Sequence, residues 1–213
     1  MSVTDFIPYD SKKAAFTNSL TPTSKYPSSG ASMPELRKLA KTLSKDSIEI
    51  VYQEDIALLA IIIASENNSF EYRKMEFDRM TNYLDSWLIT DTFASSLVFP
   101  RKEEELYFDY FLSLCDRKDE MTRRFGLVTL KSRFLSKEHL SAILTKVTEV
   151  DSEHYLLNMG AAWLLCEAMI KFPEETLPYY RRASRNVRKL ARKKCLESLR
   201  IKGEYRAFIK TLD

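Results

Sequence analysis

Two side chains four residues apart, Trp87 and Asp91, form the most suggestive chemical pair in the sequence. Residues at positions i and i+4 of an α-helix lie on one face, so the indole ring and the carboxylate would share a surface. A flat apolar ring beside a fixed negative charge suits a substrate that is cationic, or that becomes cationic in its transition state. The alternative is that Trp87 is a core residue and that Asp91 pairs with a basic neighbour such as Arg124.

Further candidates follow at related spacing, because Arg124 lies 37 residues after Trp87 and Trp163 lies 39 residues after Arg124. The guanidinium group of Arg123 or Arg124 could hold a phosphate through two hydrogen bonds, or could join neighbouring repeats to carboxylates. Trp163 follows the small residues Gly160, Ala161 and Ala162, which permit close helix packing. Taken alone, Trp163 is more typical of a core residue than of a ligand platform.

The elements that position these residues are predicted to be helices. Only 4 of the 213 residues are glycine, whereas a sheet protein of this size would need more turn glycines. Apolar residues recur at helical spacing, and Pro100 and Pro173 interrupt the pattern. Ser136 and Asp151 are the expected N-caps, and the Pro/Ser-rich residues 21–32 are expected to form a loop. We predict helices at residues 4–20, from Pro34, from Ile48 through Ile63, at 70–84, 85–97, 102–115, 120–134, 137–146, 152–171 and 173–182, and in two or three basic segments after that.

The spacing of about 40 residues is typical of HEAT-type repeats, in which each unit is one pair of helices. We therefore predict an all-α fold, an α-α superhelix of helical hairpins in a single domain over residues 1–213. In this prediction residues 1–32 form an N-terminal helix and loop, and residues 33–213 form the repeats. Equivalent positions on successive inner helices lie about 8–10 Å apart. Trp87, Arg124 and Trp163 would then form a row along a concave wall.

The net charge of +3 hides an asymmetry along the chain. The segment from Arg181 to Asp213 holds 12 Lys/Arg and 3 Asp/Glu, a net charge of +9, so the preceding residues carry −6. A local positive charge of this size attracts phosphate, which indicates a nucleic-acid partner. The alternative is a solvated basic helix.

Other classes of site find little support in the sequence. Its three cysteines, Cys115, Cys166 and Cys195, are far apart, and its two histidines lie near predicted helix starts, so we expect no metal. No phosphate-binding or dinucleotide-binding glycine motif is present, and we expect no cofactor. No apolar run approaches the roughly 18 residues that a membrane span needs. We expect a monomer in the reducing cytoplasm, without a membrane partner.

The sequence resembles the AlkD-like family of bacterial DNA alkylation repair proteins from about Met33 onward. The resemblance rests on four motifs: Met33-Pro-Glu-Leu-Arg-Lys-Leu-Ala40, Asp85-Ser-Trp-Leu-Ile-Thr-Asp91, Arg123-Arg-Phe-Gly-Leu127, and Ala161-Ala-Trp-Leu-Leu-Cys-Glu-Ala168 followed by Phe172-Pro-Glu174.

This resemblance implies a helical solenoid that holds double-stranded DNA in a basic concave groove. It also implies a DNA glycosylase that excises cationic N3- and N7-alkylpurines without flipping the base. By the same resemblance, Asp91 matches the catalytic aspartate, and Trp87 and Trp163 match the tryptophans that flank the sugar and backbone of the lesion. Arg124 matches the phosphate-binding arginine, with Arg123 as the alternative. Two other functions stay open: a non-catalytic nucleic-acid-binding solenoid and a protein-binding scaffold.

Overall fold

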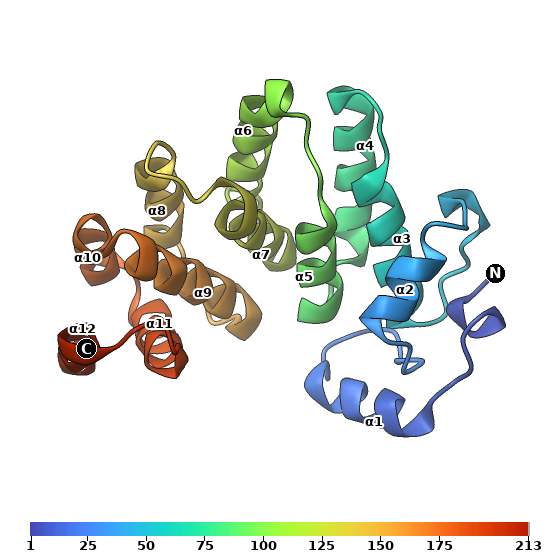
Figure 1. Cartoon of the computed structure of the whole chain (residues 1–213), viewed down its shortest axis with the longest axis horizontal. Helices are drawn as coiled ribbons and strands as arrows, with labels where there is room; N and C mark the ends of the chain where they lie inside the picture. The colour runs from blue at the N-terminus through green and yellow to red at the C-terminus, as the bar shows by residue number, and fades with distance from the viewer. Residues whose placement is uncertain (213) are drawn as a thin grey trace. The chain divides into compact units, whose positions relative to one another are not determined.

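The computed structural model describes residues 1–212, and within that range the regular elements are all helices (Figure 1). The predicted all-α class is therefore confirmed. The chain divides into two compact units, Met1–Tyr107 and Phe108–Asp213, called here the N-terminal and C-terminal units. The single-domain organisation and the concave superhelix stay predictions.

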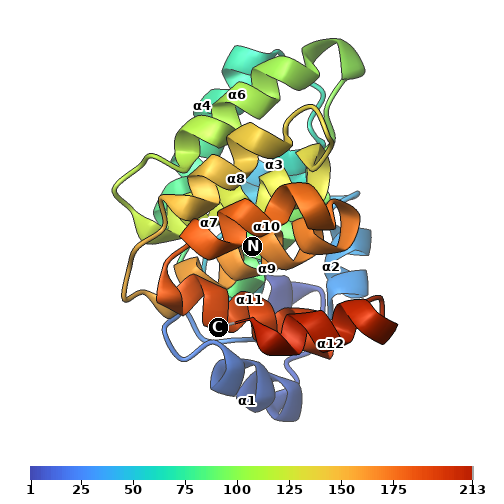
Figure 2. The ribbon, with the colours of Figure 1, turned by 90° about the vertical axis from the view of Figure 1, so that its left-hand side faces the viewer.

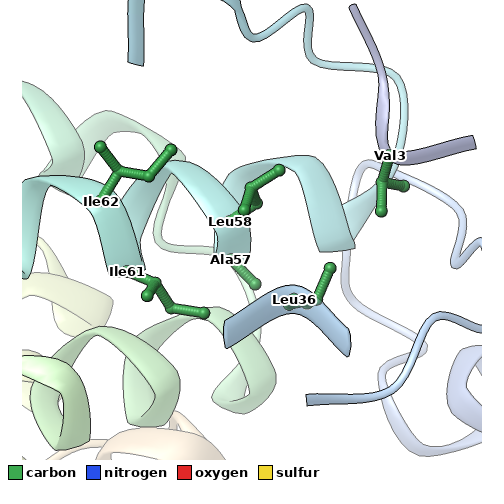
Figure 3. Close-up of a cluster of buried hydrophobic side chains, with 6 residues drawn as sticks. All are labelled: Val3, Leu36, Ala57, Leu58, Ile61 and Ile62. Carbon is green, nitrogen blue, oxygen red and sulfur yellow. The ribbon is translucent and has the colours of Figure 1, made fainter. Parts of the chain in front are cut away.

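The N-terminal unit is built around one buried helix. Its helices are α1 (Ser11–Leu20), α2 (Met33–Leu39), α3 (Gln53–Ser65), α4 (Phe70–Met80) and α5 (Trp87–Ser96), with short 3-10 turns at Val3–Asp5, Lys45–Ser47 and Thr81–Tyr83. Helix α3 contacts α2, α4 and α5, and nearly all of its residues are buried. Figure 3 shows Leu36 of α2 packed beside Ala57, Leu58 and Ile61 of α3. Such burial of apolar side chains is the main stabilising term of the unit.

The first turn of α3 also secures the N-terminal segment through three consecutive buried polar residues, Gln53, Glu54 and Asp55. Glu54 accepts hydrogen bonds from the Ser28 hydroxyl group and the Ser29 backbone N–H group. Asp55 accepts them from the Ser2 hydroxyl group and the Val3 N–H group. Buried carboxylates are costly unless they are hydrogen-bonded, so these contacts specify where residues 1–30 lie.

Two helix predictions in this unit are wrong. The first α-helix begins at Ser11 instead of Thr4, because the Asp10 carboxylate accepts hydrogen bonds from the N–H groups of Lys12 and Lys13 and caps the helix there. Residues 48–52 are not helical. The Asp55 carboxylate accepts hydrogen bonds from the N–H groups of Val51 and Tyr52 and thereby fixes the start of α3 at Gln53.

The C-terminal unit consists of two layers of helices. Helix α6 (Glu104–Leu114), preceded by a 3-10 turn at Arg101–Glu103, runs across the division between the units. It is followed by α7 (Glu120–Thr129) with a π-helical turn (Leu130–Phe134), α8 (Leu140–Thr148), α9 (Tyr155–Lys171), α10 (Pro173–Arg182), α11 (Arg185–Glu197) and α12 (Gly203–Thr211). Helix α9 packs between α7 and α11, whereas α8 packs against α10. Figures 1 and 2 both show α11 alongside α9. Helices one hairpin apart are therefore neighbours, which is the pairing expected of helical hairpins.

The predicted N-caps in this unit are wrong, although the helices themselves were expected. Helices α8 and α9 begin after His139 and His154, not after Ser136 and Asp151. The ring Nδ1 of His154 accepts a hydrogen bond from the Leu157 N–H group, as a capping side chain does. Ser136 instead lies in the turn before α8, where its hydroxyl oxygen accepts a hydrogen bond from the His139 N–H group.

Two kinds of feature are absent from the residues that the structure describes. Over residues 1–212, no helix is both long and apolar enough for a membrane span. Over the same residues, no three His, Cys, Asp or Glu side chains are grouped to hold a metal ion.

Candidate nucleic-acid interface

Helix α5 presents Trp87 and Asp91 on one side and its core residues on the other. Ile89 and Phe93 are fully buried, and the Phe93 ring meets the Phe77 ring edge to face with centroids 5.5 Å apart. This packing fixes the rotation of α5 about its axis. Trp87 and Asp91, one turn apart, remain partly exposed. Asp91 is also the only charged residue of α5, so the negative charge of this helix lies on the face that carries Trp87.

Trp87 is not a simple core residue, because its side chain is only partly buried and its indole N–H group is directed at a main-chain oxygen. The indole nitrogen donates a hydrogen bond to the carbonyl oxygen of Leu20, the last residue of α1, over 3.0 Å. This contact joins residues 67 positions apart in the chain. It restricts the orientation of the ring, which makes Trp87 a preorganised surface instead of a freely rotating one.

In the C-terminal unit, Trp163 is likewise partly exposed on α9. The Lys131 ammonium group lies over its indole ring, 2.8 Å from the ring centroid. One turn further along α9, the Glu167 carboxylate forms an ion pair with Arg200. Trp163 therefore combines an aromatic face with an adjacent positive charge, an arrangement that suits a sugar and its phosphate.

Arg124 lies against the part of α9 that precedes Trp163 in the sequence. Its side chain is 2% exposed and crosses Gly160, where an added Cβ atom would lie only 3.2 Å from Arg124 Cγ. Its Nη1 atom donates a hydrogen bond to the carbonyl oxygen of Leu156 over 2.7 Å. The close packing that the small residues before Trp163 predicted is thus present, with Gly160 providing the space for the arginine.

Arg123 is directed elsewhere, toward the C-terminal ends of two helices. Its Nε atom donates to the carbonyl oxygen of Cys115 after α6, and its Nη2 atom donates to that of Glu149 after α8. Cations at these ends satisfy carbonyl groups that have no helical partner. Of the two arginines, only Arg124 lies beside α9. A phosphate-binding role for either one stays a prediction.

The basic C-terminal segment contains a row of cations on one side of α11. Arg185, Lys189 and Lys193 recur every fourth residue and are exposed, whereas Val187 and Ala191 on the opposite side are fully buried. Four residues of helix correspond to a rise of about 6 Å, so the three charges follow one another along an inclined row on one side of α11. We call these three residues the α11 cation row. Sequence reasoning identified the segment but not the row, although a spacing of four residues is the signal that reveals it.

Several other basic side chains of this segment form hydrogen bonds or ion pairs within the protein. Arg188, Arg192 and Arg206 donate hydrogen bonds to the main-chain carbonyl oxygens of Ala183, Lys210 and Leu196, respectively. Lys194 forms an ion pair with Glu197 on α11. The segment is therefore neither a uniformly solvated basic helix nor a uniformly available phosphate site.

The candidate residues thus form two sets. Trp87 and Asp91 share one face of α5 in the N-terminal unit, and Arg124, Lys131 and Trp163 lie at α7, the following π-turn and α9 in the C-terminal unit. The predicted row that joins Trp87, Arg124 and Trp163 involves both units and stays a prediction.

Comparison with known proteins assigns the chain to a family. Neither the curated proteins nor the solved structures gave a match. A family model did match, over residues 9–199, which includes α1 to α11 and both sets of candidate residues. The chain belongs to the family of DNA alkylation repair enzymes.

Proposed function

We propose that the protein is a DNA glycosylase that excises cationic N3- and N7-alkylpurines from double-stranded DNA without flipping the base. The observation that carries the proposal is the placement of Asp91, the only charge of α5, on the partly exposed face that it shares with Trp87. Membership of the DNA alkylation repair enzymes supplies the biological setting. We further propose that the protein works as a monomer in the cytoplasm and uses neither a metal nor a cofactor.

The proposed chemistry is hydrolysis of an N-glycosidic bond. An alkylated purine of this kind already carries a positive charge, so the bond electrons can pass to the base nitrogen and the base leaves neutral, without a general acid. Positive charge then develops on the sugar, where the Asp91 carboxylate stabilises it electrostatically. A water molecule attacks C1′ and transfers a proton to Asp91, which then releases that proton to solvent. The products are the free alkylpurine and an abasic site.

The aromatic residues fit the same chemistry. The rigidly held Trp87 ring offers its electron-rich face to a sugar that becomes cationic, an attraction that increases as the charge develops. Trp163, with Lys131 above its ring, would contact the sugar–phosphate backbone. Since the lesion stays in the duplex, the enzyme avoids an unstacking cost of a few kcal/mol.

We propose that the α11 cation row supplies the main phosphate contacts of the C-terminal unit. Its charges are exposed, whereas the guanidinium groups of Arg123 and Arg124 already bind main-chain carbonyl oxygens. Arg124 is the better candidate of the two for a further phosphate contact, because it lies against the helix that carries Trp163.

The test measures release of N7-methylguanine and N3-methyladenine from methylated duplex DNA under single-turnover conditions. The wild-type protein should release both bases, and Asp91→Asn should slow release by about 10²–10³-fold, the usual effect of losing one well-placed electrostatic group. Affinity for the duplex should change little, because the charge acts mainly in the transition state. Asp46→Asn is the matched control, since Asp46 is an exposed aspartate of the same unit.

Three results would contradict the proposal. If Asp91→Asn releases bases as fast as the wild-type protein, Asp91 is not the catalytic group. If the wild-type protein releases neither base but still binds duplex DNA, the protein is a nucleic-acid-binding module. Failure to bind DNA even at low salt would instead favour a protein scaffold.

A further inference from the structure

Hydrogen bonds join the loop after α1 to the start of α5. Besides the bond from the Trp87 indole to the Leu20 carbonyl group, the Asp85 carboxylate accepts two hydrogen bonds from the loop. One comes from the Ser24 hydroxyl group over 3.0 Å, and the other from the Lys25 backbone N–H group over 2.7 Å. We call residues 20–25 together with Asp85 the Trp87 clasp. It lies entirely within the N-terminal unit.

A buried glutamine also stabilises the clasp through hydrogen bonds. The Gln53 side chain is fully buried, and its Nε2 atom donates a hydrogen bond to the Thr21 hydroxyl group over 3.0 Å. Its Oε1 atom accepts from the hydroxyl group of Ser86, the residue that precedes α5, over 3.4 Å. Gln53 thereby connects α3, the loop and the start of α5. The loop is consequently an ordered support and not a flexible connection.

We infer that the clasp sets the orientation of the Trp87 ring, with Asp85 as a positioning residue. Trp87 is the second residue after Asp85, so an anchor at Asp85 limits movement of the α5 N-terminus. The Leu20 carbonyl group, held by the same loop, then fixes the indole plane. This inference rests on the proposed function, in which the oriented Trp87 ring presents its face to the sugar of the lesion. The orientation itself can be measured without any activity.

The clasp depends on charge as well as on shape. Hydrogen bonds to an ionised carboxylate are stronger than hydrogen bonds to a neutral acceptor. Asp85→Ala removes both acceptors, whereas Asp85→Asn keeps one oxygen and loses the charge. Ser24→Ala removes a single donor and leaves Asp85 intact. We therefore expect three graded effects, largest for Asp85→Ala and smallest for Ser24→Ala.

The protein provides its own reporter, because Trp87 and Trp163 are its only tryptophans. In a Trp163→Phe background, the indole N–H group of Trp87 gives a single signal in a ¹⁵N-resolved NMR spectrum. We expect Asp85→Ala to accelerate hydrogen exchange of that group about 10-fold, which corresponds to about 1.4 kcal/mol of lost protection. Trp87 fluorescence should also become more accessible to acrylamide. Asp46→Asn, the control, should change neither quantity.

A second measurement separates positioning from general stability. With Trp163 present, Asp85→Asn should lower the single-turnover rate of base release while leaving DNA affinity nearly unchanged, since a misoriented ring loses contacts made in the transition state. Circular dichroism and urea unfolding establish that each variant is folded.

The outcomes distinguish the inference from the proposed function. Unchanged indole exchange in a folded Asp85→Ala protein would overturn the clasp. Accelerated exchange without any base release in the wild-type protein would support the clasp as a device that orients Trp87 and would overturn the glycosylase proposal. Accelerated exchange with an unchanged release rate would show that ring orientation has no part in the reaction, and so would overturn the purpose assigned to Asp85.

Discussion

The α11 cation row predicts how strongly salt weakens DNA binding. Replacing Arg185, Lys189 and Lys193 with glutamine removes three exposed charges and preserves helix propensity, so α11 should stay folded. Each lost phosphate contact should reduce the slope of log K against log salt concentration by about 0.9, or about 2.7 for the row. Between 50 and 200 mM salt, the wild-type affinity should therefore fall about 40-fold more than that of the triple variant.

The assay is a fluorescence-anisotropy titration of a labelled, undamaged duplex at several salt concentrations. The control is a second triple variant, Arg101, Lys102 and Lys118→Gln, which removes the same formal charge from other exposed positions. It should change the slope much less, because attraction between exposed charges is screened beyond about 14 Å at 50 mM salt and about 7 Å at 200 mM salt. Equal slopes for the wild-type protein and the α11 triple variant would refute the reasoning and remove α11 from the interface.

The remaining predictions concern stability and thiol chemistry. Gly30→Ala should lower the free energy of unfolding, measured by urea titration, by about 1–3 kcal/mol or more. The reason is that Gly30 has φ +82° and that an added Cβ atom would lie 2.5 Å from the Asp10 carbonyl oxygen. Gly203→Ala should lower the free energy of unfolding less, since at φ +55° its added Cβ atom would meet no atom within 4 Å. If both variants lose the same free energy of unfolding, the clash at Gly30 does not contribute. Burial raises the pKa of the Cys115 thiol to about 12, so this side chain should resist labelling by a disulfide reagent at pH 8 in the folded protein and react once urea unfolds it. Because the unfolded thiol ionises near its ordinary pKa of 9, the Cys115 contribution should make the free energy of unfolding fall as pH rises from about 9 to about 12, and a Cys115→Ser variant should lose that part of the decline.

Local patterns determined the fold class and most of the helices. Scarce glycine and apolar residues at helical spacing predicted an all-helical chain, and Pro173 predicted where α10 begins. These features act within one or two turns of the residue that carries them, so no tertiary information is needed to interpret them. The shared face of Trp87 and Asp91 follows from the same short-range geometry.

Other predictions were wrong or incomplete, in one case because of a local capping contact and in another because of contacts with distant segments. Residues 48–52 have enough apolar character for a helix, but Asp55 binds the N–H groups of Val51 and Tyr52 and makes Gln53 the first helical residue. Arg123 and Arg124 are adjacent in sequence, yet one binds carbonyl groups after α6 and α8 and the other lies along α9. Sequence could not separate their environments, because only the packing of other helices determines which carbonyl groups each side chain reaches.

The Pro/Ser-rich loop shows most clearly what only tertiary structure decided. Its composition correctly predicted a turn-rich connection, but nothing in residues 21–25 indicates that they contact a helix some 60 residues later. Folding brings the Asp85 carboxylate to the Lys25 N–H group and the Leu20 carbonyl group to the Trp87 indole. The four-residue spacing to Asp91 identified Trp87 as a candidate residue. The segment that holds its indole ring could not be identified in this way, because only the packing around α3 places that segment beside Trp87. Hydrogen bonds between distant segments leave no periodic signal in a sequence, since they require only one donor and one acceptor at the right point in space.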